Sequence, residues 1–276
     1  MDQLALQKLE KTAVELRKKI IHMIGKAESG HPGGSLSATE IVTYLFFKEM
    51  KLDVNQPNDP NRDRFVLSKG HAAPVLYAAL QEKGYFPEEW LDGLRAINSP
   101  LQGHPDMKKV PGVDMSTGSL GTGFSAALGM ALAGRLDQSD RYVYALLGDG
   151  ECQEGQVWEA AMAAAHYKLD HFIAFLDNNG LQIDGKCGEV MATEPLDEKF
   201  AAFGWDVQVI DGHDFEQIDQ AVSRAKASAG RPQMIICQTV KGQGVSFMED
   251  QCGWHGKAPN AEQVKEAMAE FAGEVE

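Results

Sequence analysis

The sequence contains neither the long apolar runs of a membrane protein nor the excess of basic residues that is typical of nucleic-acid-binding proteins. No uninterrupted apolar segment approaches the roughly 18 residues of a membrane-spanning helix. The 276 residues include 26 Lys and Arg but 40 Asp and Glu, which gives a formal net charge of −14. Such a charge disfavours binding to nucleic acids and to anionic membranes. The first residues also lack the charged-then-apolar order of a signal peptide, so we expect a cytoplasmic protein.

Cysteine is scarce, and segments that resemble linkers are absent. The four cysteines, Cys152, Cys187, Cys237 and Cys252, are scattered and form no CxxC pair. We therefore expect neither a zinc site nor a disulfide framework, and reduced thiols are the simplest interpretation. No repeat and no Pro- or Ser-rich stretch divides the chain, and 43% of its residues are hydrophobic. We expect a single domain over residues 1–276 with a full core.

Short apolar segments alternate with helical ones along the chain. Strands are predicted at residues 64–67, 142–147, 172–176, 205–210 and 233–238. Helices are predicted at about residues 9–25, 37–47, 118–136, 154–168 and 215–229. The many small residues of segment 118–136 indicate a closely packed, buried helix. Strands that alternate with helices imply an α/β fold, with a parallel sheet covered by helices on both faces.

Two polar motifs follow two of the predicted strands. Gly148-Asp149-Gly150 comes directly after the strand 142–147, and Asn178-Asn179 comes twenty-seven residues later, after the strand 172–176. The helix predicted at 154–168 joins the two strands, so both motifs are expected at the same edge of the parallel sheet. In open α/β sheets this edge, at the carboxyl ends of the strands, is where ligands bind.

The motifs carry the groups that hold a diphosphate through a divalent cation. Mg²⁺ prefers hard oxygens and usually takes one or two carboxylates together with substrate phosphates. Asp149 offers a carboxylate, Asn179 an amide oxygen and Leu181 a backbone carbonyl. Gly150 has no side chain, so its backbone can approach the phosphates closely. Gly, Asp and Asn also form ordinary turns at strand ends, but the two motifs together, on strands joined by a helix, favour the metal site.

At these motifs the sequence resembles thiamine diphosphate enzymes, and further motifs narrow the resemblance to the diphosphate-binding domain of transketolases. The resemblance extends from about residue 10 to residue 260, and its additional motifs appear in the transketolase order. They are residues 29–34 (SGHPGG), 68–72 (SKGHA), 102–105 (QGHP), 117–121 (TGSLG) and 254–257 (WHGK). The resemblance implies binding of thiamine diphosphate with Mg²⁺, or with Ca²⁺ or Mn²⁺ in its place.

The resemblance also implies roles for individual residues. His31, His104 and His255 fall where transketolases contact the hydroxyls of the donor sugar, and an imidazole titrates near the pH at which such protons are transferred. The residues that fall where the family contacts the cofactor itself are His71, Gly118, Leu120, Gly150, Asn179, Ile183, Lys241 and His255. The remaining histidines, His22, His166, His171 and His213, accompany no motif, and we expect structural roles for them.

Glu154 has two interpretations. It is a carboxylate at the amino end of a predicted helix, where the helix dipole stabilises negative charge. By analogy with the family, it could instead join a network of carboxylates that links two cofactor sites across an interface between protein chains.

The resemblance covers only the amino-terminal part of a transketolase. It implies a subunit that transfers a two-carbon ketol unit from a ketose phosphate to an aldose phosphate only together with a second chain. That partner would carry the pyrimidine-binding domain, with the carboxylate that activates the thiamine ring, and the C-terminal domain. We expect an α₂β₂ assembly in which neither nucleic acid nor membrane takes part.

Four alternatives remain at the level of sequence. Deoxyxylulose-phosphate synthases share the two cofactor motifs, but residues 31–33 and 254–256 fit transketolases better. The α subunit of a 2-oxo acid dehydrogenase also pairs with a second chain, but the histidine motifs disfavour it. A non-catalytic thiamine diphosphate-binding protein has no need of four loop histidines. A nucleotide-binding Rossmann domain is disfavoured because the glycines at 118, 121 and 123 have the wrong spacing.

Overall fold

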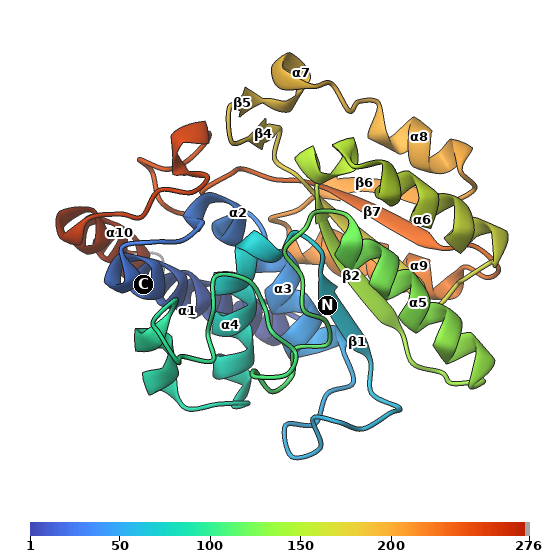
Figure 1. Ribbon diagram of the computed structural model, residues 1–276, viewed down its shortest axis with the longest axis horizontal. Helices are drawn as coiled ribbons and strands as arrows, with labels where there is room; N and C mark the ends of the chain where they lie inside the picture. Colours follow the sequence, from blue (N-terminus) through green and yellow to red (C-terminus); the bar gives the residue numbers. More distant parts are fainter. Residues whose placement is uncertain (274–276) are drawn as a thin grey trace.

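A parallel sheet of five strands forms the centre of the molecule in the computed structural model, which describes residues 1–273 (Figure 1). The strands lie in the order β1 (Arg64–Leu67), β2 (Val143–Gly148), β3 (Phe172–Asn178), β7 (Gln233–Gln238) and β6 (Asp206–Asp211). Every adjacent pair is parallel. The predicted strands agree with these bounds to within about two residues, and the predicted fold class is confirmed.

Helices cover both faces of the sheet, because alternate strand residues point into two separate cores. Leu146 and Phe175 belong to one core, and the next residues along the same strands, Leu147 and Leu176, belong to the other. The first core is closed by α1 (Gln3–Ala27), α3 (Thr39–Tyr44), α4 (Ala73–Lys83) and α9 (Phe215–Ala227). The second is closed by α5 (Thr122–Leu136), α6 (Gly155–His166) and α8 (Leu196–Ala202).

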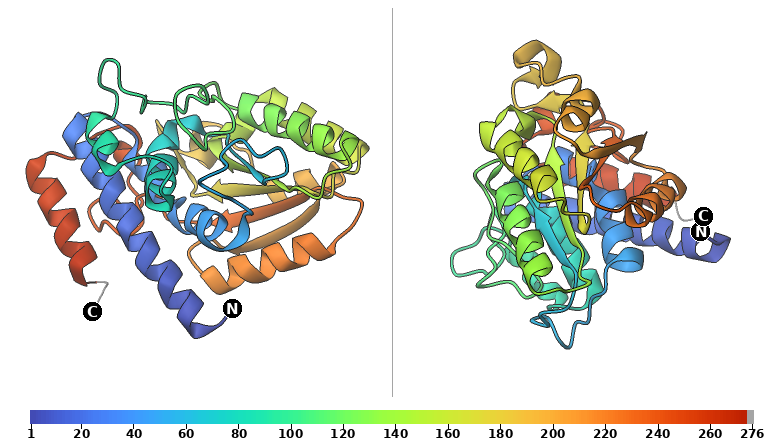
Figure 2. Two further views of the ribbon diagram at one scale, coloured as in Figure 1. Left: turned by 90° about the horizontal axis from the view of Figure 1, so that it is seen from below. Right: turned by 90° about the vertical axis from the view of Figure 1, so that its right-hand side faces the viewer.

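Shorter elements connect these layers. They are α2 (Pro32–Leu36), the π-helical turn η1 (Leu45–Glu49), the 3-10 turns η2 (Gly70–Ala72), η3 (Glu88–Gly93), η4 (Gly150–Gln153) and η5 (Cys252–Trp254), the hairpin of β4 (Leu181–Gln182) and β5 (Gly185–Lys186), and α7 (Cys187–Val190). The last helix, α10 (Ala261–Gly273), packs alongside α1, as Figure 2 shows. No helix among residues 1–273 has the length and apolarity needed to cross a membrane.

The helices differ from their predicted bounds for local reasons. Helix α1 begins earlier than predicted because the carboxylate of Asp2 accepts the Ala5 amide at 2.7 Å and caps the helix. Helix α4 has no counterpart among the predicted helices. Its residues from Ala73 to Leu80 are all buried, so the sequence there shows no alternation of apolar and polar faces.

The structure corrects the prediction that α5 is a buried helix, since only one of its faces is buried. On the inner face a Cβ added to Gly123 would lie 2.7 Å from the Cα of Ser68, so the small residue does allow close packing. On the outer face Leu136 is 83% exposed, and within the described chain no atom lies within 4 Å of a Cβ placed on Gly129. The neighbouring α6 exposes Met162 to 59%. The small and apolar residues on both faces suggested burial, but described residues cover only the inner one.

Candidate active site

A cavity of about 430 Å³ lies at the carboxyl-terminal edge of the sheet, where Gly148 of β2 pairs in register with Asp177 of β3. It is lined by every residue predicted for the site except His104. Those residues are His31, His71, Gly118, Leu120, Asp149, Gly150, Asn179, Leu181, Ile183, Lys241 and His255. They come from separate loops, which meet because parallel strands end at one edge of the sheet.

Asp149 is a buried carboxylate that accepts hydrogen bonds from two backbone amides. Its Oδ1 accepts the Gly150 amide at 2.7 Å and its Oδ2 accepts the Gly180 amide at 2.6 Å. Burial, together with the nearby negative charge of Asp177, raises the pKa of Asp149 to about 6. A buried carboxylate is costly to ionise, and the charge of Lys241 offsets this cost only in part. The position is therefore suited to a bound metal ion that would supply further positive charge.

The two other predicted metal ligands contribute neutral oxygens. The Oδ1 of Asn179 accepts the Leu181 amide at 3.1 Å, and the Leu181 carbonyl accepts the ammonium of Lys241 at 2.9 Å. Gly180, between them, has a φ of 74°, in the left-handed region that turns the chain back toward the cavity. Within residues 1–273 no group of three His, Cys, Asp or Glu side chains could hold a metal by itself. A ligand set of one carboxylate and neutral oxygens, in contrast, is suited to Mg²⁺, which takes its remaining ligands from phosphates and water.

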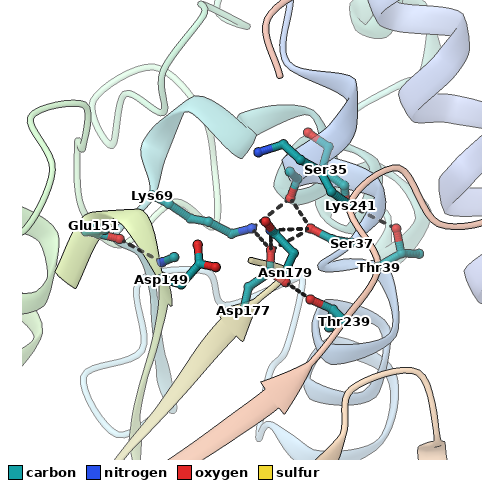
Figure 3. A network of polar contacts seen from close by, with 12 residues as sticks. Ser35, Ser37, Thr39, Lys69, Asp149, Glu151, Asp177, Asn179, Thr239 and Lys241 are labelled. Carbon is teal, nitrogen blue, oxygen red and sulfur yellow. Dashed lines mark hydrogen bonds and ion pairs between the residues drawn. The ribbon is translucent and has the colours of Figure 1, made fainter. Parts of the chain in front are cut away.

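A buried ion pair between Lys69 and Asp177 lies beside these ligands, as Figure 3 shows. The side chains are 2% and 0% exposed. Asp177 also accepts hydrogen bonds from the hydroxyls of Ser37, at 2.5 Å, and Thr239, and from the amide of Asn179 at 3.1 Å. Burial by itself raises the pKa of Asp177, but Lys69 and the hydrogen bonds outweigh it and the pKa is lowered. The ion pair therefore fixes the side chain of Asn179.

The roles of Lys69 and Asp177 were not predicted from the sequence, although a signal was present. Lys69 lies within the motif at 68–72, and Asp177 immediately precedes Asn178-Asn179. What the sequence does not show is that the two side chains meet.

Three histidine rings form a cluster at the cavity wall. The ring centres of His31, His71 and His255 are 5.1 to 5.4 Å apart. Burial, with the charge of Arg95, lowers the pKa of His31 to about 4. Burial, with the charge of Lys241, lowers the pKa of His255 to about 3, and burial also holds the pKa of His71 well below its usual value. All three rings are therefore neutral at pH 7.

Lys241 connects the predicted metal site with this histidine cluster. The residue is only 2% exposed, and its ammonium contacts both the Leu181 carbonyl and Nδ1 of His255 at 2.9 Å. Burial, with the nearby charge of Lys69, lowers the pKa of Lys241 to about 8. Since an ammonium can only donate, Nδ1 of His255 accepts and the ring proton lies on Nε2. Nδ1 of His31 is buried and has no hydrogen-bond partner among the described residues.

His104 lies outside the cavity lining. It is exposed, and its Cδ2 lies 3.4 Å from the position of a Cβ on Gly118. Arg95, which was not predicted from the sequence, packs against the preceding residue, Gly103: its Cζ atom is 2.7 Å from the position of a Cβ on Gly103. Burial, with the charge of Arg95, lowers the pKa of both His31 and His104. Arg95 is thus a cation held near the two histidines, and the sequence marks it only by its place before the motif at 102–105.

The remaining predicted residues lie on the open wall of the cavity. Ile183, at the tip of the β4–β5 hairpin, is 67% exposed. A Cβ on Gly150 would lie 3.4 Å from the Gln182 side chain, although the Gly150 amide is already bonded to Asp149. Glu154 is exposed where α6 begins, and its side chain makes no capping bond.

Comparison with known proteins identifies the family. The family model described as transketolase, thiamine diphosphate binding domain, matches residues 9–274. The chain is 50% identical to a 6-deoxy-6-sulfo-D-fructose transketolase subunit of a Clostridium species, over 95% of this chain and 96% of that one. It is 41% identical to one of the subunits of the apulose-4-phosphate transketolase of Phocaeicola vulgatus, over 98% and 96% of the two chains.

Solved transketolases share the fold. The structure from Leishmania mexicana superposes with a TM-score of 0.91 at 32% identity, covering 96% of this chain and 41% of that one. The structure from Campylobacter jejuni gives 0.90 at 34% identity, covering 99% and 43%. The chain thus spans about two fifths of these transketolases and nearly all of the separate subunits. It therefore belongs to the transketolase family, as a transketolase subunit with the thiamine diphosphate-binding domain, which confirms the predicted family and thiamine diphosphate as the predicted cofactor.

Proposed function

We propose that the chain is the diphosphate-binding half of a two-chain transketolase that moves a two-carbon ketol unit from a ketose phosphate to an aldose phosphate. One observation carries the proposal. A single cavity combines a carboxylate suited to a metal ion, the buried ammonium of Lys241 and three neutral histidines. A site that only bound the diphosphate would need the first two of these and His71, and would have no use for His31 and His255.

The residues divide into two groups by chemistry. Asp149, Asn179 and the Leu181 carbonyl would hold Mg²⁺, for which Ca²⁺ or Mn²⁺ could substitute, while Lys241 and His71 would contact the diphosphate. When bound, thiamine diphosphate supplies the electron sink for cleavage of the carbon–carbon bond.

The second group handles protons at the sugar. His31, which is neutral at pH 7, would take a proton from a donor hydroxyl, and His255, whose ring proton lies on Nε2, would donate to one. His104, exposed at the rim, would orient a hydroxyl further along the sugar. The positive charge of Arg95 would attract the anionic end of the substrate. Two relatives of this chain's length are named for a sulfosugar and a sugar phosphate, and both of those substrate classes carry such an anion.

No carboxylate among the described cavity residues is free to activate the thiamine ring at a buried position, which argues for a second chain. Asp149 would be bound to the metal, and Asp177 is paired with Lys69. Glu151 accepts hydrogen bonds from Ser68 and Gly121 through Oε1, and from Gly148 through Oε2. The activating carboxylate would thus come from a partner carrying the pyrimidine-binding and C-terminal domains.

Glu154 would lie at the contact with this partner. It is exposed at the edge of the cavity, at the start of α6. In an α₂β₂ assembly, whose symmetry repeats each contact, the position suits a carboxylate that reaches toward a second site.

Reconstitution tests the proposal. The chain, its C-terminal partner and their mixture would each be supplied with thiamine diphosphate, Mg²⁺, a ketose phosphate and an aldose phosphate. We expect no ketol transfer by either chain alone and full activity near a one-to-one ratio. Ketol transfer by the isolated chain at ordinary enzyme rates would refute the two-chain proposal. Turnover of pyruvate in place of a ketose would instead indicate the deoxyxylulose-phosphate synthase alternative, and cofactor binding without any turnover would indicate a non-catalytic protein.

A further inference from the structure

The loop that carries Lys241 is held from behind by three largely buried polar residues, Arg17, Glu40 and His213, which we call the Glu40 cluster. Arg17 belongs to α1, Glu40 to the first turn of α3, and His213 to the loop before α9. Arg17 and Glu40 are 5% and 4% exposed. The guanidinium of Arg17 pairs with Oε1 of Glu40, and Nδ1 of His213 lies 2.8 Å from Oε2. One carboxylate thus orients two side chains.

Both of those side chains reach the backbone of the Lys241 loop. The amide of Val240 donates to Nε2 of His213 at 2.9 Å, and Nε of Arg17 donates to the Gln243 carbonyl at 3.1 Å. Because Nε2 accepts, the ring proton of His213 lies on Nδ1 and is donated to Glu40. The cluster therefore holds the backbone of the loop at two points, one residue before Lys241 and two residues after it.

The backbone of the loop is shaped to receive these contacts. Gly242 and Gly244 have φ values of 84° and 85°, in the left-handed region. A Cβ on Gly244 would lie 2.8 Å from Nε of Arg17, so the guanidinium packs directly against the chain there. The Gly242 amide donates to the Gly33 carbonyl at 3.1 Å, which joins the loop to the segment that bears His31.

We propose that the Glu40 cluster is a positioning device that sets the location of the Lys241 ammonium. None of its three residues lines the cofactor cavity; they border a separate groove of about 810 Å³ between α1 and the start of α9. They act through the loop, whose lysine contacts the Leu181 carbonyl and His255. A small displacement of such a group is costly when binding depends on geometry. The inference rests on the proposed function only where Lys241 is taken to contact the cofactor diphosphate.

Hydrogen exchange of the full chain without cofactor tests the mechanical part of this proposal. The variants are Glu40→Gln, which removes the charge, and His213→Ala, which removes the contact to Val240 and leaves the Arg17 pair intact. The control is Asp63→Asn, another buried carboxylate, which accepts the amides of Lys51 and Tyr142 at 2.8 Å at the opposite end of the sheet.

In both cluster variants we expect amides of residues 239–245 to exchange about tenfold faster or more, the effect of losing one hydrogen bond of ordinary strength. In the control, exchange should accelerate around residues 51 and 142 and stay unchanged at 239–245. Unchanged exchange of this loop in His213→Ala, or an equal acceleration over the whole chain in both variants, would overturn the proposal.

Cofactor binding to the assembled two-chain enzyme tests the functional part. With Mg²⁺ present, we expect the dissociation constant of thiamine diphosphate to rise about tenfold in both cluster variants and to stay at the wild-type value in Asp63→Asn. At saturating cofactor, the loss in kcat should be smaller than the loss in cofactor affinity, because the cluster positions a binding group. A loosened loop with unchanged cofactor affinity would contradict the positioning role. Absence of cofactor binding by the wild-type assembly would instead refute the proposed function, and the exchange result would still decide whether the cluster holds the loop.

Discussion

The ammonium of Lys69 and the carboxylate of Asp177 lie beside the predicted cofactor cavity and form an ion pair that is almost completely removed from solvent. The two residues are 108 positions apart, so the pair ties the loop after β1 to the end of β3. Asp177 in turn accepts a hydrogen bond from Asn179, a predicted metal ligand. The pair thus combines a structural role with the placement of the site.

Replacing Lys69 with methionine should destabilise the protein by about 3–5 kcal/mol, because the carboxylate of Asp177 would stay buried without its cation. Chemical denaturation of the full chain measures this loss. The control is Lys186→Met, since that lysine is 71% exposed and its ion pair with Glu189 spans 3.9 Å; a surface pair contributes only about 0–1 kcal/mol. Equal losses in the two variants would contradict the importance of the buried pair.

Replacing Asp149 with alanine should abolish retention of thiamine diphosphate in the assembled enzyme, because the cofactor would be held through the metal ion. A chelator should have the same effect on the wild type. Calorimetry measures both, with Asp137→Ala as a control at a carboxylate that is 62% exposed and outside the cavity lining. Unchanged cofactor affinity after both treatments would refute the metal assignment.

Replacing His31 or His255 with alanine should slow the donor step by about 10²–10⁴-fold, the usual effect of losing an acid–base group. Thermal stability should change little, because both side chains line a cavity. Stopped-flow measurement of the donor half-reaction checks the first expectation, with His166→Ala as a control at an exposed histidine. Loss of folded protein with normal turnover per folded molecule would place both histidines in a structural role.

The stabilising effect of Glu40 should depend on pH. Burial alone raises the pKa of Glu40, but the adjacent Arg17 and the hydrogen bond from His213 outweigh burial, so the folded-state pKa lies below the ordinary 4.5. A lowered folded-state pKa means that the ion pair stabilises the protein above about pH 4.5, and that this contribution is lost as the pH falls through the folded-state pKa. The difference in unfolding free energy between wild type and Glu40→Gln should therefore be full at pH 7 and shrink in acid. A difference that is constant from pH 7 to about pH 3 would contradict this linkage.

The exposed apolar face of α5 and α6 should form part of the contact with another chain of the assembly. Obligate interfaces typically bury more than about 2,000 Å² and are rich in apolar side chains. We expect Leu136→Glu and Met162→Glu each to weaken assembly about tenfold or more, the effect of losing a well-buried contact, and to leave the melting temperature of the isolated chain unchanged. Analytical ultracentrifugation measures the assembly, and Leu4→Glu, at a leucine of α1 that is 77% exposed, is the control. Assembly at wild-type strength in both variants would exclude this face.

The strands, the fold class and the edge at which the predicted site residues meet were predictable from the sequence, because each depends on local patterns and on one general rule. Short apolar runs such as Phe172–Asn178 form buried parallel strands, and parallel strands that are joined by helices end at the same edge. Asp149 and Asn179 therefore had to meet, although a whole helix lies between them in the chain. The spacing of their two motifs also carried the family resemblance.

The tertiary structure alone decided the contacts between residues that are distant in the chain. Lys69 and Asp177 are 108 residues apart, Glu40 and His213 173, and Arg17 and Gln243 226. Taken singly, each of these charged or polar side chains resembles one that faces water, and only burial next to a specific partner gives it a role. The exposed face of α5 is a second case in which local sequence does not determine the environment of a residue. Its small, apolar residues predicted burial, but whether a face is buried depends on what packs against it, which local sequence does not specify.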